Sequence, residues 1–567
     1  MKENIVIIGA VALGPKAACR CKRLNPDANV TLIDENSYIS YGGCGMPYFV
    51  SGEVQTFDIL RSTPYQRIRD PEFFKEMKDV KVLTNTKALS IDRKNKTVLV
   101  KNLNSNAEET LNYDKLVLAT GAKARIPNIE GINLNNVYSL TSPDEAIKIR
   151  NACEQGKFNS AVIVGAGFIG LEVAVALSDM WGIKTTIIEM ASQALPGVIS
   201  HAMSHMVSND CKKHDVTIYT NEKVLKLDGK DTNVNKVITD KREIEAQLVI
   251  LAAGFIPNIS LAEEAGLKTD YGIIVNEHLQ TSDPDIYAGG DCVLTKNLIT
   301  EKLGYLPMGS LANRQGRVIG TNLAGGNDIF KGHVGTWALK LFDLNFCGTG
   351  LSLAKAQKEG FDAISVSIEQ HDNAHFYPEK TMTGLELVVD KKSSRILGIQ
   401  GVSANGASLK ARIDAIAATL FCSKPTVKDI SCLEIAYAPP FASAMDVINT
   451  VANVADNVLN GHLKQIMGDE FMQLWKDRDK NDIFFIDTRP EKAGEKVQEK
   501  YSDWHSISLE KIVDKINEIP KDKTIALVCN TGLRAYESLL ILKKHGINNI
   551  IHVAGGMQAI IKMGLEP

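Results

Sequence analysis

The sequence has no long apolar run, no excess of charge of one sign and no dense cysteine framework. Its 567 residues carry a formal net charge of −3, with acidic and basic residues mixed along the whole length. We therefore predict no nucleic-acid partner and no attraction to an anionic membrane surface. No apolar stretch approaches the length of a membrane span, so we also expect no membrane partner. We predict no metal site.

The ten cysteines are spread through a long chain, which favours a reducing compartment in which reactive thiols are catalytic rather than structural. The first expected strand, residues 4–8, begins almost at the start Met and leaves no room for a cleavable leader. We therefore expect a cytoplasmic protein. An apolar content of 44% and a charged content of 23% are typical of globular protein, and the length requires several domains.

A strand, a glycine-rich loop, a helix and a second strand follow one another over residues 4–35, the order of a dinucleotide-binding unit. The first glycine permits the tight turn, the last lets helix and strand pack closely, and the helix N-terminus attracts a pyrophosphate. An acid at the end of the second strand can hold ribose hydroxyls. Val11 replaces the middle glycine, which weakens the motif because its side chain stands where the phosphate approaches the backbone. The residues predicted to bind FAD here are Gly9, Val11, Gly14, Asp34 and Glu35.

The same pattern returns complete over residues 161–189. Its three glycines are Gly165, Gly167 and Gly170, and the acid that ends the second strand is Glu189. A carboxylate there accepts hydrogen bonds from a ribose 2′-hydroxyl and repels a 2′-phosphate. We predict that this unit binds NADH in preference to NADPH.

Two dinucleotide units in one chain are what a flavoprotein needs to place FAD and a nicotinamide face to face for hydride transfer. Strand runs that end in Thr120-Gly121 and in Gly254 are expected where the chain crosses between the two units. A third strand turns sharply at Asp291, which we predict holds the ribityl chain of the flavin.

Two cysteines lie in sequence segments that suit nucleophilic attack on sulfur. Cys44 lies in the segment Ser40–Tyr48, between the nucleotide signatures, and Cys529 begins the loop Cys529–Arg534 of a separate C-terminal segment. We therefore expect a flavin-dependent reductase joined to a sulfur-carrying module, with sulfur–sulfur bonds as substrate.

These residues resemble the two-dinucleotide flavoprotein disulfide reductases, and within them the coenzyme A-disulfide reductases and NADH-dependent persulfide reductases with a C-terminal rhodanese domain. The resemblance covers essentially the whole chain. Gly43 stands where that family commonly has asparagine, a departure that bears on the tuning of Cys44 and not on its position. The segments that carry the resemblance are Ser40–Tyr48, Tyr287–Asp291, Ala312–Arg317 and Tyr437–Phe441.

The resemblance implies an α/β fold with two Rossmann-like domains, an α+β dimerisation domain and an α/β rhodanese domain. The boundaries expected are 1–150 with 255–325 for the FAD-binding domain, 151–254 for the NAD(H)-binding domain, 326–455 for the dimerisation domain, 456–470 for a linker and 471–567 for the rhodanese domain.

Cys44 is the only cysteine between Cys21 and Cys153, so it must act without a second protein thiol. A single thiol reduces a disulfide by forming a mixed disulfide with the substrate, or by using a substrate thiol as its partner. Because Cys44 precedes Pro47 at the expected start of a helical turn, we predict that the helix N-terminus lowers its pKa.

Two other functions remain open. Single-cysteine relatives include NADH oxidases and peroxidases, which cycle the cysteine through sulfenic acid. Those enzymes usually carry a histidine in the first glycine-rich loop, and the loop Gly9–Gly14 has none, which favours disulfide or persulfide reduction. The third possibility is an electron-transfer module whose rhodanese loop only senses persulfide.

The resemblance also assigns roles outside the two cysteines. Coenzyme A phosphates would be held by basic residues near the first helix, since arginine and lysine suit phosphate. The chain would be a homodimer in which two tyrosines from the other subunit protonate the departing thiolate, and an arginine of the rhodanese loop would face Cys529. The candidates are Arg20, Lys22, Arg23 and Arg61 for coenzyme A, Tyr437 and Tyr377 for proton donation, and Arg534 for the rhodanese loop.

Overall fold

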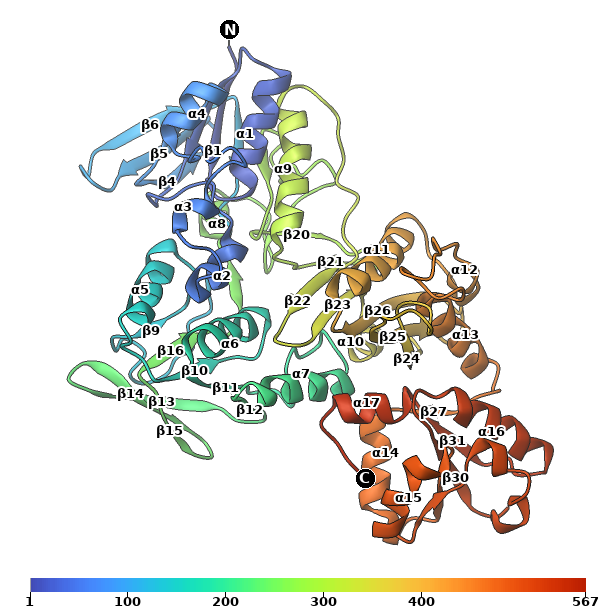
Figure 1. Ribbon diagram of the computed structural model, residues 1–567. Coiled ribbons are helices and arrows are strands. Elements are labelled where there is room, and N and C mark those ends of the chain that lie inside the picture. The colour runs from blue at the N-terminus through green and yellow to red at the C-terminus, as the bar shows by residue number, and fades with distance from the viewer. Residues whose placement is uncertain (1) are drawn as a thin grey trace. The chain divides into compact units, whose positions relative to one another are not determined.

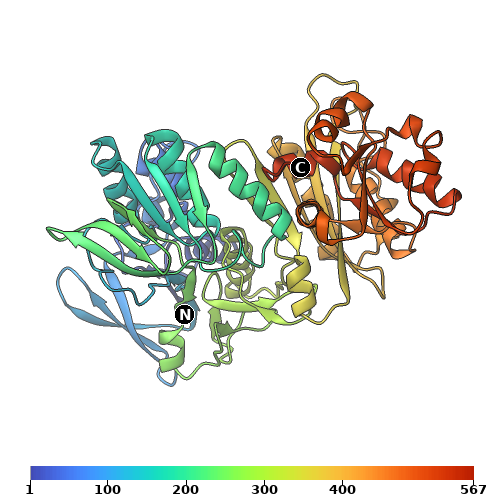
Figure 2. The ribbon, with the colours of Figure 1, turned by 90° about the horizontal axis from the view of Figure 1, so that it is seen from below.

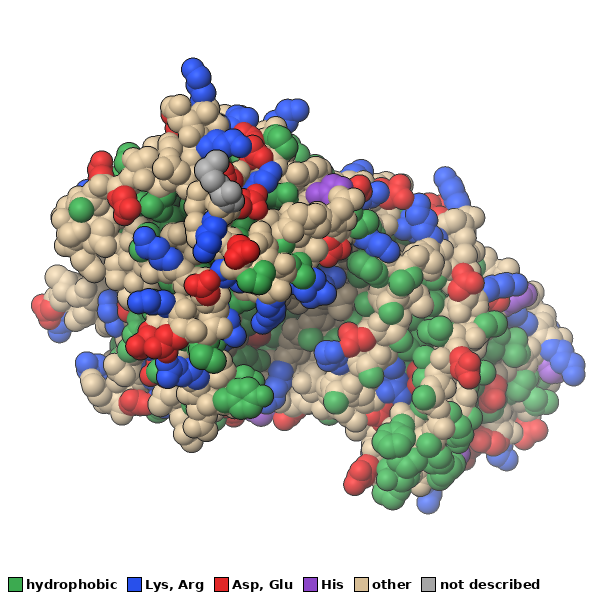
Figure 3. All heavy atoms as spheres, turned by 90° about the horizontal axis from the view of Figure 1, so that it is seen from above, with side chains coloured by type: hydrophobic (Ala, Val, Ile, Leu, Met, Phe, Trp, Pro, Cys, Tyr) green, Lys and Arg blue, Asp and Glu red, His purple; other side chains and the backbone are tan. Residues whose placement is uncertain are grey.

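The computed structural model describes residues 2–567 and divides into two compact units. The first holds the chain up to Met190 together with Glu222–His333, and the second holds Ala191–Asn221 together with Val334–Pro567. None of the helices in residues 2–567 is both long enough and apolar enough to cross a membrane. On the face drawn in Figure 3, acidic and basic side chains are intermixed, as the sequence predicts.

The first unit is built around a parallel five-stranded sheet in the order β19-β7-β1-β2-β3. Alternate residues of β1 point to opposite faces: Ile5 and Ile7 belong to the core under α1 and α9, and Val6 and Ile8 to the core shared with β5. The elements are β1 (Asn4–Ile8), β2 (Asn29–Ile33), β3 (Lys81–Leu83), β7 (Lys115–Leu118) and β19 (Ile286–Ala288), with α1 (Leu13–Leu24), α4 (Pro71–Lys78), α9 (Gly309–Leu323) and the antiparallel β4 (Thr86–Asp92), β5 (Thr97–Asn102) and β6 (Glu108–Asn112).

A second parallel sheet of this unit has β11, β10, β16 and β9 as successive neighbours. Antiparallel β8 (Ala122–Ala124) and β17 (Phe255–Pro257) pair where the chain passes between the two sheets, as the sequence predicts. The remaining elements are β9 (Val137–Tyr138), β10 (Ser160–Val164), β11 (Lys184–Ile188), β13 (Val224–Lys230), β14 (Asn233–Thr239), β15 (Glu243–Glu245), β16 (Leu248–Leu251), β18 (Ile273–Ile274), β20 (Val293–Lys296) and β21 (Leu303–Gly304), with helices α2 (Met46–Ser51), α3 (Phe57–Leu60), α5 (Pro143–Glu154), α6 (Phe168–Trp181) and α8 (Ser260–Glu264).

The second unit contains an antiparallel sheet in the order β22-β23-β26-β25-β24, followed by helices (Figure 1). Its central strand β26 is buried at every residue. The elements are α7 (His201–Lys213), β12 (Val216–Tyr219), β22 (Trp337–Lys340), β23 (Asn345–Gly350), α10 (Leu353–Lys358), β24 (Ala363–His371), β25 (Met382–Asp390), β26 (Ile396–Ser403), α11 (Gly406–Cys422), α12 (Val427–Ser431) and α13 (Val447–Leu459).

The same unit ends in a parallel sheet of order β27-β31-β30-β28-β29 with helices on both faces (Figures 1 and 2). Ile525 and Leu527 of β30 face the core under α16, and Ala526 and Val528 face the core under α14 and α17. Residues 456–470, expected as a linker, hold the end of α13, β27 and the start of α14. The elements are β27 (Gln465–Ile466), β28 (Ile483–Asp487), β29 (Trp504–Ser506), β30 (Thr524–Val528), β31 (Ile550–Val553), α14 (Gly468–Lys476), α15 (Glu491–Lys500), α16 (Leu533–Lys544) and α17 (Gly556–Lys562).

Candidate active site

Cys44 lies in a short 3-10 turn, Gly43–Gly45, that runs directly into α2. Gly45 packs closely against Leu60, since a Cβ there would lie 2.4 Å from the Leu60 side chain. Pro47 stands in the first turn of α2, where its missing N–H costs nothing. Cys44 is exposed as a residue, and its thiol lies beside the first turn of α9, since a Cβ built on Gly309 would be 3.7 Å from the Cys44 Sγ.

Two carboxyl groups set the electrostatics of this thiol. Partial burial, then the charges of Glu172 and Asp291, raise the pKa of Cys44. Burial also raises the pKa of Glu172 to about 7 and that of Asp291 to about 6. The predicted lowering of the Cys44 pKa is therefore opposite in direction to the shift in the folded chain, because partial burial and then the two nearby acids outweigh the short helix α2.

Glu172 is a residue that the sequence analysis missed. It lies in α6, two residues after the last glycine of the second glycine-rich loop, and is the only charged residue in Phe168–Leu177. A lone acid in an apolar helix was the available signal, but only the folded chain brings it near Cys44.

The first glycine-rich loop has the close approaches that a dinucleotide fold needs. Gly9 has φ +109°, and a Cβ there would lie 2.0 Å from the Ala119 carbonyl oxygen. A Cβ on Gly14 would lie 1.9 Å from the Gly9 carbonyl oxygen, so helix and strand can approach only through glycine. Asp34, 7% exposed, accepts a 2.7 Å hydrogen bond from the Ala10 N–H and thereby closes the loop.

The second loop repeats this geometry. Gly165 has φ +111°, and its Cβ would lie 2.4 Å from the Ala252 carbonyl oxygen. A Cβ on Gly170 would lie 2.1 Å from the Gly165 carbonyl oxygen, and Glu189 accepts a 2.8 Å bond from the Ala166 N–H. Two segments with this arrangement fit two dinucleotides.

The other predicted cofactor residues lie around these loops. Thr120 donates a 2.7 Å hydrogen bond to the Asn258 carbonyl, which ties the crossing strands together. Glu35 is half exposed and lies 3.4 Å from the Lys87 ammonium, so Asp34 is the buried acid of the pair. Gly121 (φ +65°) and Gly254 (φ +96°) both adopt left-handed backbone, as glycine allows.

Lys22, a predicted coenzyme A residue, is engaged in local structure. Its ammonium donates to the carbonyls of Pro26 and Ala28, and pairs with Asp79 at 2.6 Å. The side chain is 8% exposed. These contacts favour a structural role over phosphate binding.

The three predicted arginines differ in availability. Arg20 donates a 3.1 Å bond from Nε to Thr321 Oγ1, and Arg61 donates a 2.7 Å bond to Asp58. Arg23 is exposed near the end of α1. Arg23 is the most accessible of the three candidates.

The loop of Cys529 follows β30 directly and enters α16. Cys529 is 2% exposed, and its Sγ accepts a 3.1 Å bond from the Gly532 N–H. Gly532 has φ +115°, and its carbonyl lies 2.8 Å from the buried His552 ring. The amides of Met557 and Gln558 donate to the Cys529 and Asn530 carbonyls, which fixes the loop against α17. One backbone amide thus faces the sulfur, as predicted for this loop, while Arg534 lies half-buried in the first turn of α16.

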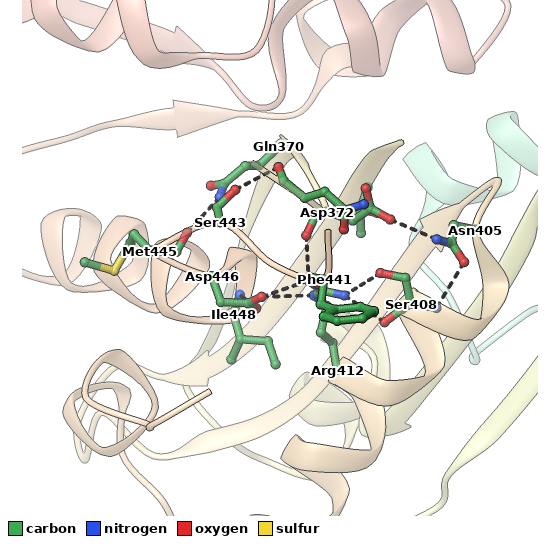
Figure 4. Close-up of polar contacts among 12 residues, drawn as sticks. Gln370, Asp372, Asn405, Ser408, Arg412, Phe441, Ser443, Met445, Asp446 and Ile448 are labelled. Atoms are coloured by element: carbon green, nitrogen blue, oxygen red, sulfur yellow. Dashed lines mark hydrogen bonds and ion pairs between the residues drawn. The ribbon is translucent and has the colours of Figure 1, made fainter. Parts of the chain in front are cut away.

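The predicted tyrosines lie in two loops of the second unit that Arg412 holds together (Figure 4). Its guanidinium donates to the carbonyls of Asp372 (2.7 Å) and Phe441 (3.2 Å), and pairs with Asp446 at 2.9 Å. Arg412 is 7% exposed and Asp446 is 2% exposed. The first loop, between β24 and β25, carries Tyr377, and the second, between α12 and α13, carries Tyr437.

Further bonds join the same loops. The Ala374 N–H donates to the Pro439 carbonyl at 3.2 Å, and the Tyr377 N–H donates to Ala374 at 2.8 Å. Tyr437 itself is 52% exposed, in company with other exposed apolar side chains. These are Phe376, Phe441 and Met445. Such a group of exposed apolar side chains is typical of a protein interface.

Comparison with known proteins identifies the family. Residues 3–314 match the pyridine nucleotide-disulphide oxidoreductase family, residues 338–447 its dimerisation domain, and residues 471–563 the rhodanese-like domain. The chain belongs to the pyridine nucleotide-disulphide oxidoreductase family. The resemblance and the fold class predicted from the sequence are therefore confirmed.

Members of this family with stated activities are similar over long stretches. The NAD(P)H sulfur oxidoreductase (CoA-dependent) of Pyrococcus abyssi is 36% identical over 456 residues, covering 80% of this chain and 98% of that protein. A NADH oxidase of Methanocaldococcus jannaschii is 32% identical over 452 residues, covering 79% of this chain and 98% of that protein. The solved structure of a NAD-dependent persulfide reductase from A. fulgidus has a TM-score of 0.92 at 38% identity, covering 98% of this chain and 99% of that one.

Proposed function

We propose that this oxidoreductase uses NADH to reduce the sulfur–sulfur bond of coenzyme A disulfide, coenzyme A persulfide or polysulfide, with Cys44 as the attacking sulfur. The observation that carries the proposal is one exposed cysteine between the two dinucleotide loops of the sequence, with two partly buried acids near it. The relatives named for CoA-dependent sulfur reduction and persulfide reduction, which match most of the chain, support the same substrate class.

The residues fit the two cofactors that the family implies. Gly9, Gly14 and Asp34 would hold FAD, and Gly165, Gly170 and Glu189 would hold NADH, since the glycines let strand, loop and helix pack as closely as a dinucleotide fold needs and each acid fixes its loop. FAD, when bound, takes a hydride from NADH and supplies two electrons to sulfur.

The chemistry at Cys44 balances as follows. The Cys44 thiolate attacks one sulfur of the substrate, forms a mixed disulfide and displaces the other half as a thiolate, which takes a proton. Two electrons and one proton then cleave the mixed disulfide, release the second thiol and restore the Cys44 thiolate. Tyr437 and Tyr377, supplied by a second copy in a homodimer, would give protons to the departing thiolates. The exposed apolar side chains beside Tyr437 support that dimer.

The second sulfur site extends the proposal. The Cys529 thiolate would attack the sulfane sulfur of a persulfide or polysulfide, break its bond to the rest of the donor, release that rest as an anion and become a persulfide, which the Gly532 amide that already faces the Cys529 sulfur would stabilise. We place the reaction in the cytoplasm, where thiols stay reduced, and all ten cysteines of this chain are free thiols.

The test is anaerobic NADH oxidation by purified wild-type protein and by Cys44→Ser, with each sulfur acceptor offered separately and sulfide measured. We expect Cys44→Ser to lose turnover by roughly a thousandfold or more, because the covalent intermediate is removed. Cys422→Ser is the matched control, since Cys422 is an exposed thiol outside both sites. Full turnover in Cys44→Ser would overturn the proposal.

NADH oxidation by oxygen is the second candidate, favoured by the relative that is named a NADH oxidase. Admitting oxygen as a separate trial distinguishes the two. Turnover with oxygen alone, and none with sulfur acceptors, would replace the first proposal with the second.

A further inference from the structure

A cluster of two histidines and an acid lies where α7 meets the C-terminal module, inside the second unit. His201 and His205 are one turn apart on α7, so both rings lie on the same helix face. Asp469 comes from the first turn of α14. One ligand atom from each of the three lies within 4.8 Å of the other two.

The distances suit a shared cation. The Nδ1 atom of His201 lies 3.4 Å from Oδ2 of Asp469, and the two imidazole rings are 4.8 Å apart at their centroids. Two ligand atoms at the usual zinc distances of about 2.0–2.1 Å in a tetrahedron are separated by about 3.3 Å. The His201–Asp469 pair already has that spacing, and a rotamer adjustment of His205 would complete the set.

Asp469 is not needed as a capping residue of its own helix, α14. The Glu470 carboxylate accepts a 3.1 Å bond from the Met467 N–H at the start of α14, so the adjacent residue performs that role. The other carboxylate oxygen of Asp469, Oδ1, is buried and has no hydrogen-bond partner among the described residues. A buried carboxylate oxygen without a partner is costly unless a cation or water compensates it.

A buried acid of β25 adds a second carboxylate oxygen without a hydrogen-bond partner within residues 2–567. Glu386 of β25 is 2% exposed, and its carboxylate is electrostatically coupled to Asp469. It accepts from the hydroxyls of Ser200 and Ser365, yet its Oε1 atom also lacks a partner in the part of the chain described. The nearby cation is Lys476, which lies two turns after Asp469 on α14 and interacts electrostatically with His205. The junction therefore holds two acids whose free oxygens are buried.

We propose that His201, His205 and Asp469 bind one divalent transition metal of the zinc type, which fastens α14 to α7. Two imidazoles and one carboxylate are ligands that zinc accepts, and water would complete a four-coordinate site because His201 is half exposed. The site ties the C-terminal module to the rest of its unit.

The surrounding contacts hold the ligands in place before metal arrives. Asn209, on the same helix as both histidines, donates a 3.0 Å bond to the Lys562 carbonyl of α17. The Lys562 ammonium pairs at 2.6 Å with Glu369, which is 1% exposed at its side chain. A site built on such fixed helices loses little entropy on binding.

The test is a Zn²⁺ titration by calorimetry of the flavin-loaded, chelator-treated full-length protein. We expect wild type to bind one more Zn²⁺ per chain than His201→Ala, His205→Ala or Asp469→Asn. Binding to the free cysteines is common to all of these proteins and cancels in the difference. His201→Ala is the lead variant because its exposed side chain can be removed without loss of packing, and His462→Ala is the matched exposed control that keeps the full count.

A second cluster, which also includes residues of α7, provides the variant that distinguishes the proposed Zn²⁺ site from an alternative one. Asp210, His214 and Asp343 also place ligand atoms within 4.8 Å of one another, but with a single imidazole. Loss of one Zn²⁺ in His214→Ala and none in His201→Ala would overturn the proposal, as would equal counts in all variants. Zn²⁺ should also raise the melting temperature of wild type and not of His201→Ala, which needs no turnover and so separates this inference from the proposed reaction.

Discussion

The two candidate reactive cysteines lie in opposite kinds of surroundings. Cys44 is an exposed residue, and the pKa of its thiol is raised by partial burial and then by the charges of two carboxyl groups. Cys529 is 2% exposed, and its sulfur accepts a backbone N–H from a loop fixed by glycine. The thiol proposed to meet a large substrate thus belongs to an exposed residue near two carboxyl groups, whereas the thiol proposed to hold one sulfur atom is buried and accepts one backbone N–H.

The supports of the two sites differ as well. The loops that carry the tyrosines proposed to serve Cys44 depend on one buried side chain, Arg412, with long-range partners. The Cys529 loop depends on backbone geometry at Gly532 and on neighbours close in the fold. We therefore expect a substitution that impairs the function of one site to leave the other site active.

The largest expected effect is that of Arg412→Met. Removing the cation leaves Asp446 buried and unpaired and frees two loop carbonyls, which should lower the free energy of unfolding by about 3–5 kcal/mol. Denaturant unfolding followed by circular dichroism measures it. At permissive temperature we expect sulfur reduction to fall while sulfur loading of Cys529 persists.

Lys410→Met on the same helix is the control for that change. Lys410 forms an exposed pair with Asp414, so its loss should alter stability by no more than about 0.5 kcal/mol. Equal effects of the two substitutions would show that the Arg412 contacts carry no special weight.

Gly532→Ala should have the next largest effect. The residue has φ +115°, and a Cβ would lie 3.1 Å from the His552 ring, so the loop would be strained by about 1–3 kcal/mol. Sulfur transfer from thiosulfate, followed as persulfide on the Cys529 peptide by mass spectrometry, should fall roughly tenfold or more. NADH-driven reduction at Cys44 should not change.

Gly546→Ala separates loop geometry from general strain. Gly546 also has positive φ, at +83°, but a Cβ there meets nothing within 4 Å. If it impaired persulfide formation as much as Gly532→Ala, the special role of the Cys529 loop would be refuted.

Local pattern in the sequence was enough to predict the dinucleotide units. The expected strand 4–8 matches β1 at both ends, because an apolar run, a glycine turn and a terminal acid are all local signals. The rhodanese loop was found in the same way, from residues next to one another in the chain. The assigned roles of single site residues stay predictions.

What the sequence could not predict depends on contacts between distant segments. The pKa of Cys44 is raised by partial burial and then by the charges of Glu172 in α6 and Asp291 after β19, so a prediction from α2 alone had the wrong sign. Lys22 resembled a phosphate ligand until its partners Pro26, Ala28 and Asp79 were known. The residues next to Arg412 in the sequence likewise give no indication of its contacts with Asp372, Phe441 and Asp446.

The smallest effect is expected from Glu172→Gln, which tests the charge at Cys44 directly. Burial is the largest cause of the raised Cys44 pKa and Glu172 is the next, so the substitution should lower that pKa while leaving it above its ordinary value. In wild type, Glu172 ionises near pH 7, and its new charge then opposes ionisation of the thiol. Without it, alkylation of Cys44 by iodoacetamide should be a few-fold faster above pH 7 and nearly unchanged at pH 6, where Glu172 is mostly protonated.

The control is Glu53→Gln, because Glu53 is an exposed acid that is not among the causes of the Cys44 shift. Alkylation of Cys529 in the same samples should stay constant. A slower reaction of Cys44 in Glu172→Gln would show that the carboxyl assists the thiolate, and the contrast drawn between the two sulfur sites would then be wrong.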